Sequence, residues 1–121
     1  MKKQLNDMHQ LTAFRKEGFR GLVYVLFVRE PRATIAESEF VGLLPGFFKP
    51  KPGLKWHGKL AADLLIDLWG LDGVERLSHA RVAEKYGLSA ERIRQIEAHL
   101  LRKLRFPSAV EKYERRPFGQ D

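Results

Sequence analysis

The sequence predicts a mainly α-helical protein that ends in a helix-turn-helix, and two capped segments separated by a glycine carry this prediction. Ser78 is a suitable N-cap for a helix over about 79–86, and Gly87 suits the turn that follows it. Ser89 is a suitable cap for a second helix over about 90–105, which a proline then ends. A helix, a tight glycine turn and a second capped helix together make a helix-turn-helix.

The chain is short, basic and free of cysteine. Its 121 residues carry a formal net charge of +7, because 22 lysines and arginines outnumber 15 aspartates and glutamates. A basic balance of this size favours polyanionic partners such as nucleic acid. The absence of cysteine excludes disulfides, thiolate zinc sites and cysteine nucleophiles. The length suits one compact domain, or a small domain with an extension.

No apolar segment is long enough to suggest a membrane helix. The longest apolar run, Leu22 to Val28, is far shorter than the roughly 20 residues that a membrane span needs. After the initial Met-Lys-Lys, polar residues stand where a signal peptide is apolar. We therefore expect a soluble, cytoplasmic protein with no membrane partner.

A run rich in proline and glycine divides the sequence. Residues 45–53 contain three prolines and two glycines, a composition that is not expected to continue a helix or a central strand. We therefore expect an N-terminal segment over 1–53 that ends in this linker, a domain over 54–108, and a basic tail over 109–121.

The N-terminal segment has weaker patterns, and we favour helices for it. Residues 22–28 are apolar and β-branched enough for a buried strand or a buried helix, and so short a run leaves both open. Residues 34–44 suggest a short helix that Pro45 ends. Apolar residues at three-residue spacing suggest one more helical face near the N-terminus: Leu5, Met8, Leu11 and Phe14.

The domain over 54–108 has a clear apolar pattern. Its first helix is predicted from four leucines on one face and ends around Trp69 and Gly70. In the helix-turn-helix, Ala83 is small where the two helices cross, which permits a close approach. The leucines of the first helix are Leu60, Leu64, Leu65 and Leu68. The apolar wedge of the helix-turn-helix is Val82, Tyr86, Leu88, Ile93 and Ile96.

The outward face of the second helix of the motif carries residue types that recognise DNA. In this motif, the first turns of the second helix enter the major groove. Arginine offers a planar fork to guanine or phosphate, glutamine pairs with adenine, and glutamate accepts a hydrogen bond from cytosine. The alternative is a solvated face with ion pairs that contribute only a few tenths of a kcal/mol each. The side chains in question are Glu91, Arg92, Arg94 and Gln95, followed by His99, Arg102, Lys103 and Arg105.

A longer run of residues makes the pattern more specific. The run Glu91-Arg-Ile-Arg-Gln-Ile-Glu-Ala98, followed by Leu101-Arg-Lys-Leu-Arg105, resembles region four of the primary bacterial sigma factors. Upstream, Trp69-Gly-Leu-Asp72 is similar to the aromatic-Gly-Ile-Asp turn of that family. The resemblance covers roughly residues 58–108. It implies a bacterial setting, either in the cell itself or as a phage-encoded protein that acts in a bacterial host.

The resemblance implies roles for individual residues. The early positions of the second helix would face the upstream (minus-35) promoter element, and the later basic positions would lie near the DNA backbone or contact activators. The preceding helix would pack on the flap of the RNA polymerase β subunit, although its apolar face could equally be internal core. The implied DNA-binding residues are Ser89, Glu91, Arg92, Arg94, Gln95, His99, Arg102 and Lys103. The implied polymerase or activator contacts are Leu64, Leu68, Leu71 and Arg105.

Two departures from the family pattern limit the resemblance. Ala90 stands where the family usually has an arginine, and losing one bidentate base contact costs about 1–3 kcal/mol. We therefore expect altered or weakened recognition of the usual promoter hexamer. Nothing in the sequence resembles the sigma regions that melt DNA and grip the polymerase clamp, so the chain is not expected to be a complete conventional sigma factor.

These observations favour a DNA-binding transcription regulator over other classes. The main alternative is a protein-interaction module that mimics sigma, binds RNA polymerase and displaces or redirects the host sigma factor; RNA binding ranks third. We expect no cofactor, metal or enzymatic activity, because the sequence has no glycine-rich phosphate loop or catalytic triad pattern. The four histidines also lack metal-ligand spacing: His9, His57, His79 and His99.

Overall fold

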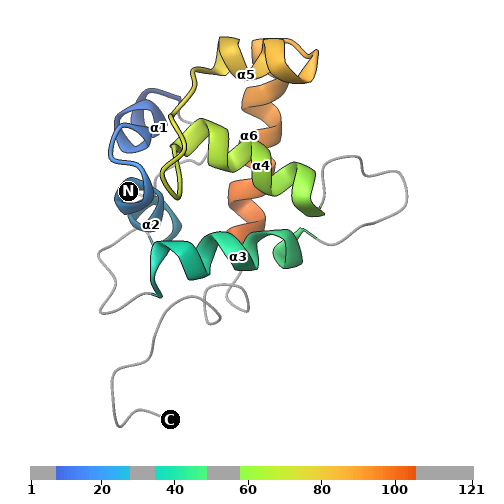
Figure 1. Ribbon diagram of the computed structural model, residues 1–121. Coiled ribbons are helices and arrows are strands. Elements are labelled where there is room, and N and C mark those ends of the chain that lie inside the picture. The colour runs from blue at the N-terminus through green and yellow to red at the C-terminus, as the bar shows by residue number, and fades with distance from the viewer. Residues whose placement is uncertain (1–7, 28–34, 49–57, 106–121) are drawn as a thin grey trace, which may run out of the picture.

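The computed structural model describes residues 8–27, 35–48 and 58–105, and these residues form helices joined by turns, without a strand (Figure 1). The mainly α-helical fold expected from the sequence is therefore confirmed. The first part of the chain forms α1 (Met8–Arg15), α2 (Phe19–Phe27) and α3 (Glu37–Phe47). The second part forms α4 (Gly58–Trp69), α5 (His79–Tyr86) and α6 (Ala90–Leu104).

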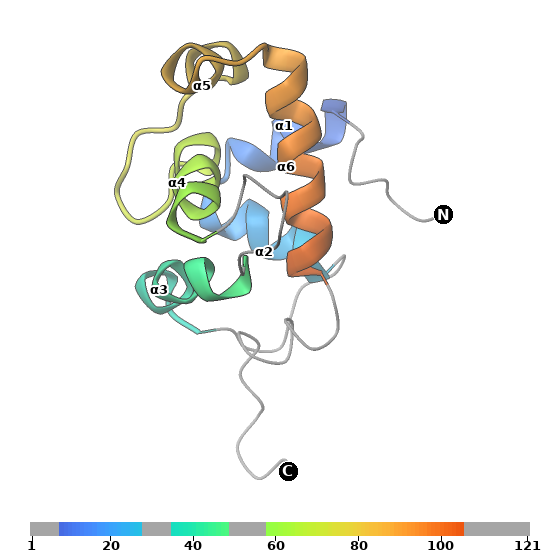
Figure 2. The ribbon, with the colours of Figure 1, turned by 90° about the vertical axis from the view of Figure 1, so that its right-hand side faces the viewer.

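Helix α4 lies in the middle of the molecule. It packs chiefly against α3 on one side, and it contacts α5 and α6 on the other (Figures 1 and 2). Helices α1 and α2 form a hairpin beside α4, and the long α6 runs from α5 down to the level of α3. The first three helices are therefore built onto the helix-turn-helix and do not stand apart from it.

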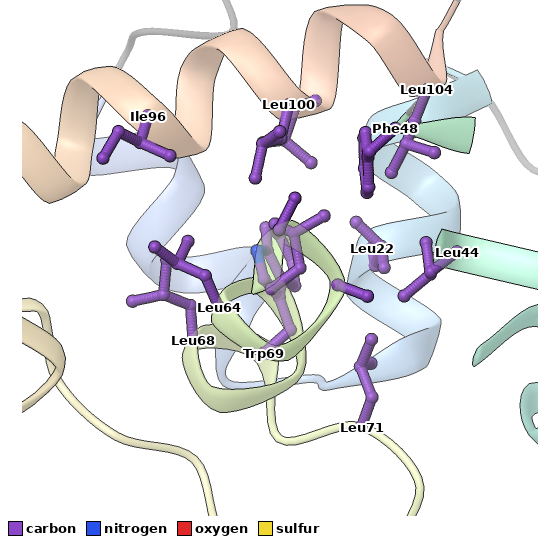
Figure 3. Packing of buried hydrophobic residues seen from close by; sticks show 14 of the residues in the cluster. Leu22, Leu44, Phe48, Leu64, Leu68, Trp69, Leu71, Ile96, Leu100 and Leu104 are labelled. Carbon is purple, nitrogen blue, oxygen red and sulfur yellow. The ribbon is translucent and has the colours of Figure 1, made fainter. Parts of the chain in front are cut away.

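One hydrophobic core joins the two parts of the chain. Leu22 of α2, Leu44 of α3 and Leu100 of α6 are each 0% exposed and belong to the same cluster as Trp69 of α4 (Figure 3). Burying a side chain of this size contributes roughly 1.5–3 kcal/mol. The domain boundary near residue 53 stays a prediction, but core side chains from both sides of it pack together.

The apolar run that begins at Leu22 is helical. It lies in α2, which confirms the helix favoured over a strand for the described part of this run. Gly18 has a φ of 64° and turns the chain between α1 and α2. A Cβ at Gly21 would overlap the backbone carbonyl of Phe14, so only glycine permits this close approach of the two helices.

The predicted end of α3 is wrong. The helix does not stop at Leu44 but continues through Pro45 to Phe47. The proline lies in the last turn, and Phe48 closes this turn by donating its backbone N–H to the carbonyl of Pro45 at 3.3 Å. Leu44 and Phe48 are both 0% exposed, so burial on either side of the proline stabilises the turn. The rest of the predicted linker, residues 49–53, lies outside the described residues, as do Leu5, His57 and the tail over 109–121.

Candidate nucleic-acid interface

The turn between α5 and α6 has the predicted local geometry. The hydroxyl of Ser78 accepts a hydrogen bond from the backbone N–H of Arg81 at 3.2 Å, and that of Ser89 accepts one from the N–H of Arg92 at 3.0 Å. Gly87 lies between the two helices with a φ of 70°, in the left-handed region. Both N-caps and the glycine turn are therefore confirmed, and α6 ends at Leu104, one residue before the predicted end.

Small and branched apolar side chains fix the crossing of α5 and α6. Val82 and Ile93 are 0% exposed, Ile96 is 3% exposed, and Ala83 is 6% exposed where the helices approach each other. The backbone N–H of Leu88 donates to the carbonyl of Ala83 at 2.9 Å, which ties the turn to the end of α5. This packing holds the start of α6 at a defined angle to α5.

The predicted DNA-binding side chains lie on or beside the outward face of α6. Among the described residues, the arginines near the start of α6 make long contacts along the helix: Nη1 of Arg92 is 3.4 Å from Oε1 of Gln95. Likewise, Nη1 of Arg94 is 3.5 Å from Oε1 of Glu91. Such pairs contribute a few tenths of a kcal/mol and do not fix the side chains. The exposed residues are Ser89, Glu91, Arg92, Gln95 and Arg102, and the half-buried residues are Arg94, His99, Lys103 and Arg105.

The three leucines considered as polymerase contacts lie in the core. Leu64, Leu68 and Leu71 are each 0% exposed, and they point into the cluster between α4 and its neighbours (Figure 3). Of the two roles that the sequence left open for these leucines, polymerase contact or internal core, their burial agrees with internal core. Arg105, the fourth residue in this group, is half-buried at the end of α6.

A buried carboxylate in α6 is the main feature that sequence reasoning missed. Glu97 is 0% exposed, and Nη1 of Arg15 lies 3.1 Å from both of its carboxylate oxygens. Nε1 of Trp69 donates to Oε2 of Glu97 at 2.9 Å, and Nε2 of His79 lies 3.0 Å from Oε1. Burial lowers the pKa of Arg15, and the charge of Glu97 opposes this shift. Glu97 thus joins α1, α4 and α5 to α6.

A second buried carboxylate joins α4 to α5. Asp67 is 6% exposed, and its Oδ2 accepts hydrogen bonds from Nζ of Lys85 at 2.8 Å and from the hydroxyl of Tyr86 at 3.1 Å. Burial and the negative charge of Asp67 raise the pKa of Tyr86. These contacts hold the C-terminal end of α5 against α4.

The sequence indicates that Glu97 is buried, but it gives no indication that Arg15 is its charged partner. Glu97 interrupts the apolar positions of α6, between Ile93 and Leu101, and an acid at such a position needs buried partners. Arg15 is 82 residues away, and no spacing rule connects the two.

The described residues form neither a metal-binding cluster of side chains nor a membrane-spanning helix. They contain no group of three or more histidine, aspartate or glutamate side chains arranged to hold a metal ion. None of the helices in 8–27, 35–48 and 58–105 has both the length and the apolar character needed to cross a membrane.

Comparison with known proteins agrees with this geometry. Residues 63–105 match the family model described as "Sigma-70, region 4", a span that runs from within α4 to the residue after α6. No curated protein and no solved structure gives a significant match. The match covers less than half of the chain, and it confirms the resemblance found in the sequence. Residues 63–105 thus form a sigma-70 region 4-like domain that contains the helix-turn-helix.

Proposed function

We propose that this protein is a transcription regulator that binds promoter DNA through α6. The observation that carries the proposal is the polar outward face of α6, which follows the Ser89 cap within a sigma-70 region 4-like domain. In a helix-turn-helix, this part of the second helix enters the major groove. The N-terminal end of the helix also has a partial positive charge, which favours a nearby phosphate.

The side chains at the start of α6 suit direct recognition of bases. Arg92 and Arg94 each offer a guanidinium that forms paired hydrogen bonds with guanine or phosphate. Gln95 suits adenine, and Glu91 suits the amino group of cytosine. Their contacts with one another are 3.4–3.5 Å long, so little free energy is lost when they exchange these contacts for DNA.

The remaining members of the DNA-binding set suit the phosphate backbone. Arg102 is exposed, and His99 and Lys103 are half-buried further along α6. Ser89 is exposed at the cap, with its hydroxyl oxygen engaged by the backbone N–H of Arg92. Backbone contacts carry no sequence information but set the position of the protein on the duplex.

We also propose RNA polymerase as a partner, on the support of the region 4 match. A contact with the β flap through Leu64, Leu68 and Leu71 requires these leucines to leave a core in which they are fully buried. Leu64 and Leu68 lie on the side of α4 away from Leu44 of α3, so such a contact would require movement of the elements that cover that side of α4 (Figure 3). A contact through the exposed surface of the domain needs no such change.

A second candidate function is a sigma mimic that acts through polymerase without reading DNA by itself. The observation that favours it is Ala90, because its methyl group cannot replace the base contact of an arginine. In that case the exposed face of α6 would contact protein or serve only as a solvated surface.

Selection from a random duplex library, at moderate salt and with the full chain, separates the two candidates. Enrichment of one motif by the protein alone supports DNA recognition through α6. Enrichment only after core polymerase is added supports the mimic, and no enrichment in either case contradicts the DNA-binding proposal. Lys59→Ala is a suitable control for the loss of one positive charge. Its side chain is 82% exposed on α4, and it forms an ion pair with Asp63 on the same helix.

A further inference from the structure

Helix α6 carries a buried negative charge that contacts side chains of three other helices. Glu97 is 0% exposed, and its carboxylate contacts one side chain each from α1, α4 and α5. The tryptophan donates without a charge, and the histidine is charged only when protonated. Among the described residues, Arg15 is therefore the partner of Glu97 that is always charged.

Two other guanidinium groups lie near this pair. Burial is the main cause that lowers the pKa of Arg15, and charge repulsion from Arg76 and then from Arg94 lowers it further, so both groups are within electrostatic range of Arg15. Arg94 also precedes Glu97 by three residues, and side chains at this spacing are neighbours on a helix. The contact that Arg94 makes with Glu91 is long, at 3.5 Å, and its side chain is 39% exposed.

Removing Arg15 would leave a buried carboxylate without a permanent positive charge. An uncompensated buried charge is strongly unfavourable, so the variant is stabilised when a weakly held cation within reach takes the place of Arg15. Arg94 meets this description, because it lies on the same helix and is weakly held. Turning towards Glu97 would take its guanidinium away from the outward face of α6.

We propose that Arg15 is a positioning residue for DNA recognition: it neutralises Glu97 from α1 and thereby leaves Arg94 on the outward face of α6. Helix α1 is then part of the DNA-recognition unit, although it lies outside the region 4-like span. This inference rests on the proposed function, since it assigns Arg94 to DNA.

The full chain with Arg15→Met tests the proposal through two dissociation constants, one for the selected motif and one for a shuffled duplex. We expect the specificity ratio, which is the dissociation constant for the shuffled duplex divided by that for the selected motif, to fall by about tenfold, as for the loss of one bidentate base contact. Arg15 is 4% exposed and does not reach phosphate, so the salt dependence of binding should stay unchanged. A merely destabilised protein would instead lose affinity for both duplexes by the same factor, and that result overturns the proposal.

Two variants serve as control and rescue. Arg20→Met removes the same charge from an exposed position on α2 and should leave the ratio unchanged. Arg15→Met combined with Glu97→Gln removes the buried charge while keeping an acceptor for Trp69, and it should restore the ratio. Should Arg15→Met fail to fold, the double variant decides alone: wild-type specificity supports charge compensation, and lost specificity contradicts it.

Hydrogen exchange of the arginine guanidinium groups, followed by ¹⁵N NMR of the free protein, gives a readout that does not depend on DNA. In Arg15→Met, the guanidinium of Arg94 should become protected from exchange with water, while in the wild type it should exchange rapidly. An unchanged Arg94 signal overturns the positioning role. If the wild type selects no DNA motif but Arg94 becomes protected in the variant, the proposed function fails while the exchange of partners at Glu97 stands.

Discussion

Arg15 and Glu97 form a buried ion pair between the first and the last described helix, with Nη1 of Arg15 3.1 Å from both carboxylate oxygens. The side chains are 5% and 0% exposed. This pair connects α1 to α6, and α1 lies outside the span that matches region 4. The buried charge of Glu97 in α6 is therefore neutralised from a segment that the match does not include.

Breaking the pair should destabilise the whole fold. We expect Arg15→Met to lower the free energy of unfolding by about 3 kcal/mol, the lower end for a buried pair that loses one partner. Urea unfolding at neutral pH, followed by circular dichroism, measures this change. Arg20→Met is the control, because Arg20 is exposed on α2, and equal losses in the two variants would show that the Arg15 contact is not the cause.

The turn between α5 and α6 should require glycine at position 87. Gly87 has a φ of 70°, and alanine in this region costs about 1–2 kcal/mol. Gly42 is a matched control in the exposed part of α3, where a Cβ meets no atom within 4 Å. Alanine there should stabilise the helix by about 0.5–1 kcal/mol. Thermal unfolding of both variants should therefore give shifts of opposite sign, and shifts of the same sign would contradict the turn geometry.

The burial of α4 leads to a prediction about Leu68. Because this side chain is 0% exposed, Leu68→Ala should lower the free energy of unfolding by about 2–5 kcal/mol. Leu43→Ala, at a position 41% exposed on α3, should change it by less than about 0.5 kcal/mol. A Leu68 variant that is as stable as the wild type but binds polymerase weakly would restore Leu68 as a contact residue.

Alkaline pH should act through Tyr86. Its pKa is raised in the folded state, by burial first and then by the charge of Asp67, so folding favours the protonated hydroxyl. This contribution is fully present below the ordinary tyrosine pKa of about 10 and is lost as pH rises towards the higher folded value. The wild type should therefore lose stability above pH ~10 more steeply than Tyr86→Phe.

The control for the alkaline prediction is the exposed Tyr24, which stacks on Phe14 with ring centroids 5.1 Å apart. Tyr24→Phe should keep the wild-type dependence on pH, because Tyr24 is exposed and, within the described part of the chain, is not bonded to a buried carboxylate. Urea unfolding at several alkaline pH values measures both slopes. Parallel curves for the wild type and Tyr86→Phe would exclude the proposed role of the Tyr86 hydroxyl.

The sequence was most informative where structure depends on local rules. The serine caps and Gly87 act within a few residues, so the helices around the turn could be predicted almost to the residue. The same local rules misplaced the end of α3. Pro45 predicts a stop, but the burial of Leu44 and Phe48 outweighs it, and burial depends on helices elsewhere in the chain.

In the candidate site, too, the features set by one helix could be predicted, and those set by tertiary packing could not. The outward residues of α6 could be selected from spacing and family resemblance, because they follow from the periodicity of one helix. The partners of Glu97 could not, since Arg15, Trp69 and His79 come from three helices brought together only by the tertiary fold. Similarly, the leucines of α4 show the same apolar pattern whether they face a partner or the core.

The affinity of Arg94→Ala for the selected duplex tests most directly whether α6 recognises DNA sequence, as proposed above. We expect the loss of about 1–3 kcal/mol of binding free energy for that duplex, together with relaxed preference at one base position. Lys59→Ala should bind with wild-type affinity and preference. If Arg94→Ala keeps both the affinity and the motif of the wild type, α6 is not the element that reads the bases.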